Sequence, residues 1–255
     1  MFRRNGFCEI AMWSVWFFVG VLVAAPSAAQ QKLAITSVSG ADEDFFYQGE
    51  YLGGGTRRIF RREHHGLQVI ALGDGAFSAG LLRGGLPGAG WDRETNDALS
   101  GERKGRVLTL SSDERRVVVT DGVATVHDAA GSVWAVLNKI RRVSSTLGAR
   151  PAVDATVLFD GTTVEHWEDA KMTEDGLLMA GVMTRMPVQD FFLHLEFRTP
   201  YMPHARGQGR GNSGVYIQRR YEVQILDSFG LSGADNECGA LYRQQEPDFN
   251  MCLPP

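Results

Sequence analysis

Polar side chains recur at every second position in three short segments of the C-terminal half of the chain. Alternate side chains of a β-strand share one face, so each segment predicts a strand with one apolar face and one polar face. If the three strands are neighbours, their polar faces form a surface with carboxylates, hydrogen-bonding groups and an aromatic ring, which suits a polyhydroxylated ligand. The polar residues are His194, Glu196 and Arg198, then Tyr216 and Gln218, then Glu222 and Gln224.

The same alternation has a simpler explanation, because an antiparallel sheet commonly has one solvated polar face. Periodicity alone favours that explanation. The apolar partners of the third segment, Val223 and Ile225, are expected to face the core, and Glu222 is therefore expected to point away from it.

Five sequence blocks, in this order, resemble the 3-keto-disaccharide hydrolase domain family over about residues 155–255. The resemblance implies an all-β fold, a concanavalin-like β-sandwich of the jelly-roll type. The upstream part resembles the N-terminal extension of some secreted members. The blocks are VLFDGT at residues 157–162 followed by Trp167, DFFLHLEFR at 190–198, GNSGVY at 211–216, YEVQILD at 221–227 and GALY at 239–242.

The resemblance also implies a reaction on a sugar with a ketone at carbon 3. That ketone acidifies the proton at carbon 2, so a general base can remove it, expel the glycosidic oxygen by elimination and leave water to add later. Glu222 is the first candidate for the base, with Glu196 and His194 as alternatives for acid or base. The residues expected to bind substrate are Arg198, Tyr216, Arg219, Gln224 and Trp167. A divalent cation held by Glu222, Asp227 or His194 would also stabilise an enolate.

Family members usually continue past the Pro-Pro pair with further strands, whereas this sequence ends at Pro254 and Pro255. The second unit is therefore expected to be an incomplete sandwich, and an inactive fragment is one alternative. Another is a non-catalytic carbohydrate-binding module that stacks sugars on Trp167, Tyr216 and Tyr221.

The first 29 residues have the pattern of a secretory signal peptide. Arg3 and Arg4 precede an apolar run at residues 10–25, and small residues close the segment at 27–29. The run is shorter than the roughly 20 residues that span a bilayer. Cleavage after Ala29 is predicted, with a secreted or periplasmic product that keeps no membrane span.

Removal of the signal peptide would leave two of the three cysteines, Cys238 and Cys252. An even number in an oxidising compartment predicts a disulfide, and closing a loop of this length is worth roughly 3 kcal/mol in the chain-entropy estimate. A thiol nucleophile or half of a zinc site is the alternative, but neither cysteine has a nearby His or the C-x-x-C spacing.

The sequence of the rest of the mature chain predicts short strands joined by tight turns. Asp74-Gly75 and Asp121-Gly122 separate apolar runs and predict hairpins, so residues 30–147 are expected to form an antiparallel β meander. A small, polar stretch ending at Pro151 predicts a linker at residues 148–154. The net charge of -4 argues against nucleic-acid binding, which requires a basic face.

Overall fold

The computed structural model describes residues 33–55, 63–94 and 96–255. The predicted signal peptide lies outside these residues. The described part is all-β, with three short 3-10 helices, Val38–Gly40, Glu43–Phe46 and Gly207–Gly209, and no α-helix. None of its helices is long and apolar enough to cross a membrane.

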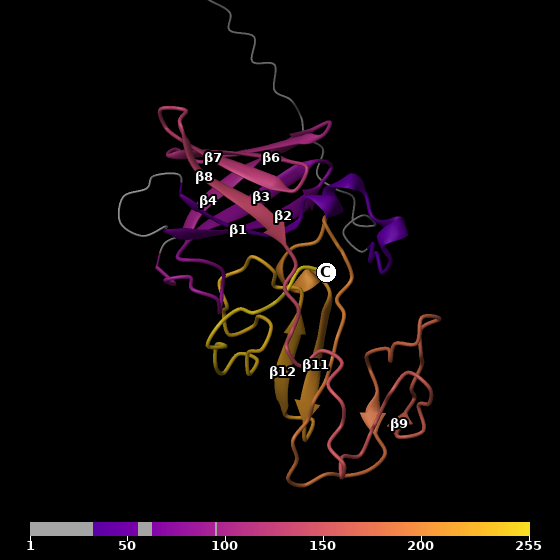
Figure 1. Cartoon of the computed structure of the whole chain (residues 1–255). Helices are drawn as coiled ribbons and strands as arrows, with labels where there is room; N and C mark the ends of the chain where they lie inside the picture. Colours follow the sequence, from indigo (N-terminus) through magenta and orange to yellow (C-terminus); the bar gives the residue numbers. More distant parts are fainter. Residues whose placement is uncertain (1–32, 56–62, 95) are drawn as a thin grey trace, which may run out of the picture.

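The N-terminal unit is a closed antiparallel barrel (Figure 1). Each strand pairs with the next, and β8 returns to pair with β1. The hairpin predictions are confirmed, because Asp74-Gly75 and Asp121-Gly122 both adopt the positive φ angles of tight turns. The strands are β1 Gly49–Gly55, β2 His64–Gly73, β3 Ala76–Arg83, β4 Asn96–Lys104, β5 Val107–Ser111, β6 Arg115–Thr120, β7 Val123–Asp128 and β8 Val133–Ile140.

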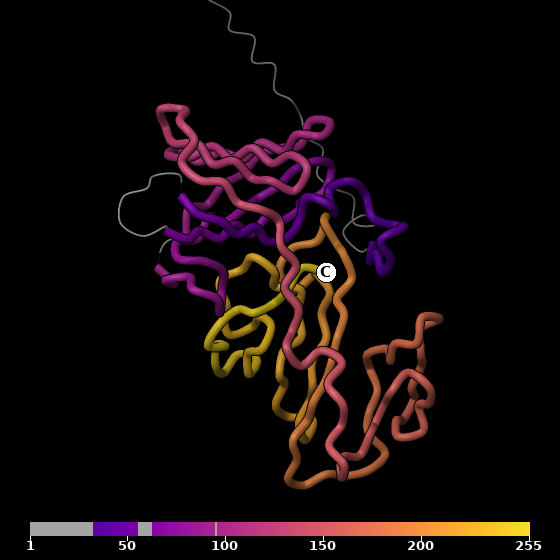
Figure 2. The backbone as a smooth tube through the Cα atoms, in the orientation of Figure 1, coloured from indigo at the N-terminus to yellow at the C-terminus, as the bar shows by residue number. Residues whose placement is uncertain are grey.

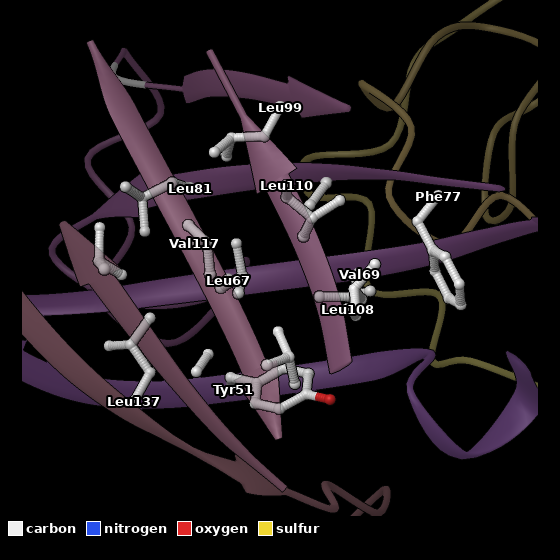
Figure 3. Packing of buried hydrophobic residues seen from close by; sticks show 14 of the residues in the cluster. Tyr51, Leu67, Val69, Phe77, Leu81, Leu99, Leu108, Leu110, Val117 and Leu137 are labelled. Atoms are coloured by element: carbon white, nitrogen blue, oxygen red, sulfur yellow. The ribbon is translucent and has the colours of Figure 1, made fainter. Parts of the chain in front are cut away.

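Alternation along these strands builds the core inside the barrel. Inward-facing residues such as Tyr51, Leu67 and Leu137 are fully buried, and they meet side chains from the opposite wall (Figure 3). An eight-stranded barrel has an interior that side chains can fill. The meander is thus stabilised as a closed barrel around an apolar core.

The C-terminal half contains much less regular structure. β9 Trp167–Glu168 and β10 Met183–Thr184 form one small sheet, and β11 Asn212–Ile217 and β12 Tyr221–Leu226 form a hairpin. The predicted jelly-roll sandwich is not confirmed in the described residues. One predicted strand is absent, since residues 191–198 are assigned to no strand, and its apolar side chains, such as Leu195 and Phe197, are about half exposed because no second layer covers them.

The segment after the barrel packs back against it. Tyr201 belongs to the barrel core, where its hydroxyl donates to Asp42 at 3.1 Å and its ring meets Phe45 edge-on. A second, smaller cluster joins Ile70 on the outer face of β2 to Phe229 and Cys252. Figure 2 shows the chain running away from the barrel after β8 and returning to it before β11. The barrel therefore anchors the hairpin that carries the candidate site.

The predicted disulfide is not formed in this structure, where Cys238 and Cys252 are free cysteines. Both side chains nevertheless belong to the same small cluster, in which Cys238 packs against Ile70, Phe229 and Cys252. The sequence prediction of a disulfide is therefore not borne out, although the two cysteines, 14 positions apart, do fold into one cluster.

Candidate functional site

The hairpin β11–β12 brings Tyr216 and Glu222 together. They are opposite each other in the antiparallel register, and Tyr216 Oη donates to Glu222 Oε2 at 2.7 Å. This hydrogen bond to a carboxylate raises the pKa of Tyr216, so its phenol stays protonated at neutral pH. The turn between the strands places Gln218 and Arg219 at φ 55° each. Tyr216 is 61% exposed, which leaves this pair open to a ligand.

Gln224 extends the polar face from Glu222 toward the interior. It is 2% exposed. In one orientation its amide nitrogen donates to Gln208 Oε1 at 3.0 Å, and in the other it donates to Ser213 O at 2.8 Å and Glu222 Oε1 at 3.3 Å. Gly214 lies opposite Gln224, and a Cβ at this position would overlap the carboxyl group of Glu222. The missing side chain at Gly214 thus provides the space that Glu222 occupies.

The predicted orientation of β12 is wrong. Gln224 and Leu226 are buried on the polar face, whereas Val223 is 37% exposed on the face that was expected to meet the core. The reason is tertiary: Gln208 contacts the Gln224 side chain on the first face, whereas residues 239–242 pair with the edge of β12 through backbone hydrogen bonds. Glu222 itself is half-buried rather than fully solvated.

His194, Glu196 and Arg198 form a separate group on residues 191–198. His194 Nε2 lies 3.2 Å from Glu196 Oε1, and the same carboxylate accepts from Gly148 N at 2.5 Å. These hydrogen bonds, the one from Gly148 first, lower the pKa of Glu196. Arg198 pairs with Asp175 at 2.6 Å. Within the described residues no hydrogen bond or ion pair joins this group to Glu222, so the single predicted surface is divided into two.

The remaining predicted residues have local partners. Trp167 Nε1 donates to Leu158 O at 2.8 Å, and Arg219 Nη2 lies 2.7 Å from Met183 Sδ. Asp227 is 1% exposed and lies 3.6 Å from Arg210, and burial raises its pKa. The described residues contain no group of three or more His, Cys, Asp or Glu side chains that could hold a metal ion. The predicted cation ligands Glu222, Asp227 and His194 therefore form no such group in the described part of the chain.

The comparison with known families concerns this half of the chain. Residues 154–255 match the family model of the 3-keto-alpha-glucoside-1,2-lyase-like domain. This match confirms the resemblance of the five blocks and supports a carbohydrate-related function. No curated protein and no solved structure matches the chain significantly.

Two residues of the matched segment, Gln208 and Arg210, were missed by the sequence reasoning. Gln208 donates from a glycine-flanked loop toward Asn236 O at 2.6 Å and faces the Gln224 amide. Arg210 is 6% exposed, forms an ion pair with Asp227 at 3.6 Å and donates a hydrogen bond to Phe229 O at 3.4 Å. The available signal was the segment GQGRG at residues 207–211, in which two polar side chains alternate with glycines directly before a family block.

Proposed function

We propose that the lyase-like domain acts on carbohydrates that carry a ketone at carbon 3 and cleaves their glycosidic bond by elimination followed by hydration. The observation that carries the proposal is the pair Tyr216–Glu222, a ligand-accessible carboxylate held by a protonated phenol, inside the segment that matches the family. Such a pair has the components of general acid–base catalysis.

In the proposed reaction Glu222 takes the proton from carbon 2 of the sugar, and the electron pair of that bond forms an enolate with the ketone. The enolate then re-forms the ketone as a double bond forms between carbons 1 and 2, and the glycosidic oxygen leaves and takes up the proton that Glu222 removed. Water adds to carbon 1, and a proton returns to carbon 2. Tyr216 orients the carboxylate before the proton transfer, and the Gln224 amide supports it from the buried side.

The experiment that tests this function compares two substrates with the full chain. A chromogenic 3-keto-glucoside should release its aglycone, and the same glucoside with a hydroxyl at carbon 3 should not, because its carbon 2 proton is not acidic. Equal cleavage of both would favour an ordinary glycosidase. Binding of the keto sugar without release of aglycone would favour a carbohydrate-binding module, in which the exposed ring of Tyr216 provides a stacking surface.

We also propose that the chain is exported and processed after Ala29, and that residues 30–147 and 155–255 are separate units linked by 148–154. The pattern of basic, apolar and small residues supports the first part, and the end of β8 at Ile140 supports the second. The intact mass of protein recovered from outside the cytoplasm should correspond to a chain that begins at Gln30. Recovery of only the full-length, cytoplasmic chain would contradict export.

A further inference from the structure

Residues 239–242 extend the β11–β12 hairpin by one more strand, because they pair with the free edge of β12. The pairing is antiparallel, and Tyr242 N donates to Glu222 O at 2.9 Å. Tyr242 is therefore directly opposite Glu222, and opposite residues of an antiparallel pair present their side chains on the same face of the sheet. Tyr216 is opposite Glu222 on the other side. The carboxylate thus lies between two tyrosines, one on each neighbouring strand.

The carboxyl group of Glu222 is engaged on the β11 side only. Its Oε2 accepts from Tyr216 Oη at 2.7 Å, and its Oε1 occupies the position that a Cβ of Gly214 would take. The hydroxyl of Tyr242, by contrast, makes no hydrogen bond within the part of the chain that the structure describes. The proton of this phenol can therefore be donated to an oxygen of a bound substrate.

Tyr242 is held in place by its neighbours. It is half-buried, and the guanidinium of Arg243 lies 5.7 Å from the centroid of its ring. Arg243 is itself anchored, since its N donates to Asp235 O at 2.8 Å and its Nη1 lies 3.7 Å from Asp235 Oδ1. The hydrogen bond to Glu222 is the main cause that raises the pKa of Tyr216, and the proximity of Tyr242 adds to it. The two phenols are therefore close enough to interact electrostatically.

The proposed elimination puts negative charge on the oxygen at carbon 3, next to the carbon that loses its proton. A hydrogen-bond donor beside the base stabilises such an enolate. Adjacent strands are about 4.8 Å apart, so a sugar with carbon 2 over Glu222 has its carbon 3 oxygen within reach of a side chain on the next strand. Tyr216 is already bonded to the base. Tyr242 is the phenol that can reach this oxygen.

We propose that Tyr242 is a catalytic residue of the lyase-like domain and donates a hydrogen bond to the oxygen at carbon 3 as the enolate forms. The phenol keeps its proton throughout. The electron pair of the bond between carbon 2 and hydrogen moves into the enolate, and the proton goes to Glu222. This inference rests on the proposed function, to which it adds the group that stabilises the enolate.

The test separates enolate formation from release of the aglycone. The 3-keto derivative of 1,5-anhydroglucitol has the ketone and the carbon 2 proton but no leaving group, so with the full chain in D2O it can only exchange that proton for deuterium. NMR measures this exchange. Tyr242→Phe should slow both the exchange and aglycone release from a chromogenic 3-keto-glucoside by about 100-fold, the scale of loss when one oxyanion donor is removed. The effect should appear in kcat, with KM nearly unchanged.

The matched control is Tyr47→Phe, the same change at a half-buried tyrosine that packs against the barrel core. Its ring also has an arginine guanidinium, that of Arg103, at 5.7 Å from the centroid. This variant should alter neither the exchange nor the release of aglycone. Equal losses in the two variants would show that removal of any such hydroxyl is damaging and would contradict a specific role of Tyr242.

Deuterium exchange at the parent rate in Tyr242→Phe would overturn the proposal. Slow aglycone release with normal exchange would also overturn it, because the phenol would then act on the leaving oxygen. If the unsubstituted chain neither exchanges nor releases aglycone, the proposed function itself fails and this inference falls with it. An active parent with an equally active Tyr242→Phe refutes the inference alone.

A second variant covers the case in which Tyr242→Phe does not give the circular dichroism spectrum of the parent protein. Incorporation of 3,5-difluorotyrosine at position 242 keeps the hydroxyl, but fluorine makes a phenol more acidic. Because the donor must be protonated, the alkaline limb of the pH profile of kcat should move to lower pH. An unmoved limb would contradict the assigned role.

Discussion

Replacing Glu222 with Gln should lower turnover of a 3-keto-glycoside by about 100-fold or more, the scale of losses when a general base is removed. The amide has nearly the same shape as the carboxylate, and Tyr216 can still donate to its oxygen. It cannot accept the proton from carbon 2. Steady-state kinetics with a chromogenic 3-keto-glucoside measure the effect, which should appear in kcat rather than in KM alone.

The matched control is Glu174→Gln, the same change at an exposed position of the same domain. It should leave turnover unchanged, and both variants should change the free energy of unfolding by only about 0.5 kcal/mol. Unaltered activity of Glu222→Gln would remove Glu222 from the role of base. Glu196, whose carboxylate is hydrogen-bonded to His194 and Gly148, would then be the next candidate to replace.

The features predicted correctly from the sequence are those that residues close together in the chain determine, namely tight turns and a short hairpin. Asp74-Gly75 and Asp121-Gly122 specify their turns locally, because these residues accept positive φ angles that most side chains avoid. The family blocks likewise located Tyr216 and Glu222, whose contact depends on a single short hairpin.

What the sequence did not predict depends on partners far along the chain. The barrel closes through the pairing of β1 with β8, which are far apart in the sequence. Tyr201 is likewise distant from residues 51–137, which form most of the core that it joins. The face of β12 was assigned wrongly for the same reason. Alternation places Val223 and Gln224 on opposite faces, but it is Gln208, distant from β12 in the sequence, that contacts Gln224 while Val223 stays exposed.

The second large effect, a loss of stability, is expected at the seam of the barrel, where β1 pairs with β8. Arg142, just after β8, donates to both carboxylate oxygens of Glu50 on β1 at 2.6 Å each, and its third hydrogen bond goes to Pro87 O at 2.7 Å. Glu50 is 2% exposed and is also bonded by Gln68 at 3.1 Å. Arg142→Ala would leave this buried carboxylate without its counter-charge. Such a loss costs about 3–5 kcal/mol, so the urea midpoint of unfolding should fall strongly.

Arg141→Ala is the matched control, because Arg141 is the exposed neighbour with the same charge. It should change the free energy of unfolding by no more than about 0.5 kcal/mol. The double variant Glu50→Leu with Arg142→Met should regain most of the stability, since replacing a buried ion pair by apolar residues of similar size is often neutral. If Arg142→Ala costs less than about 1 kcal/mol, the value of a solvent-exposed pair, water must reach Glu50 and the seam is not sealed by this contact.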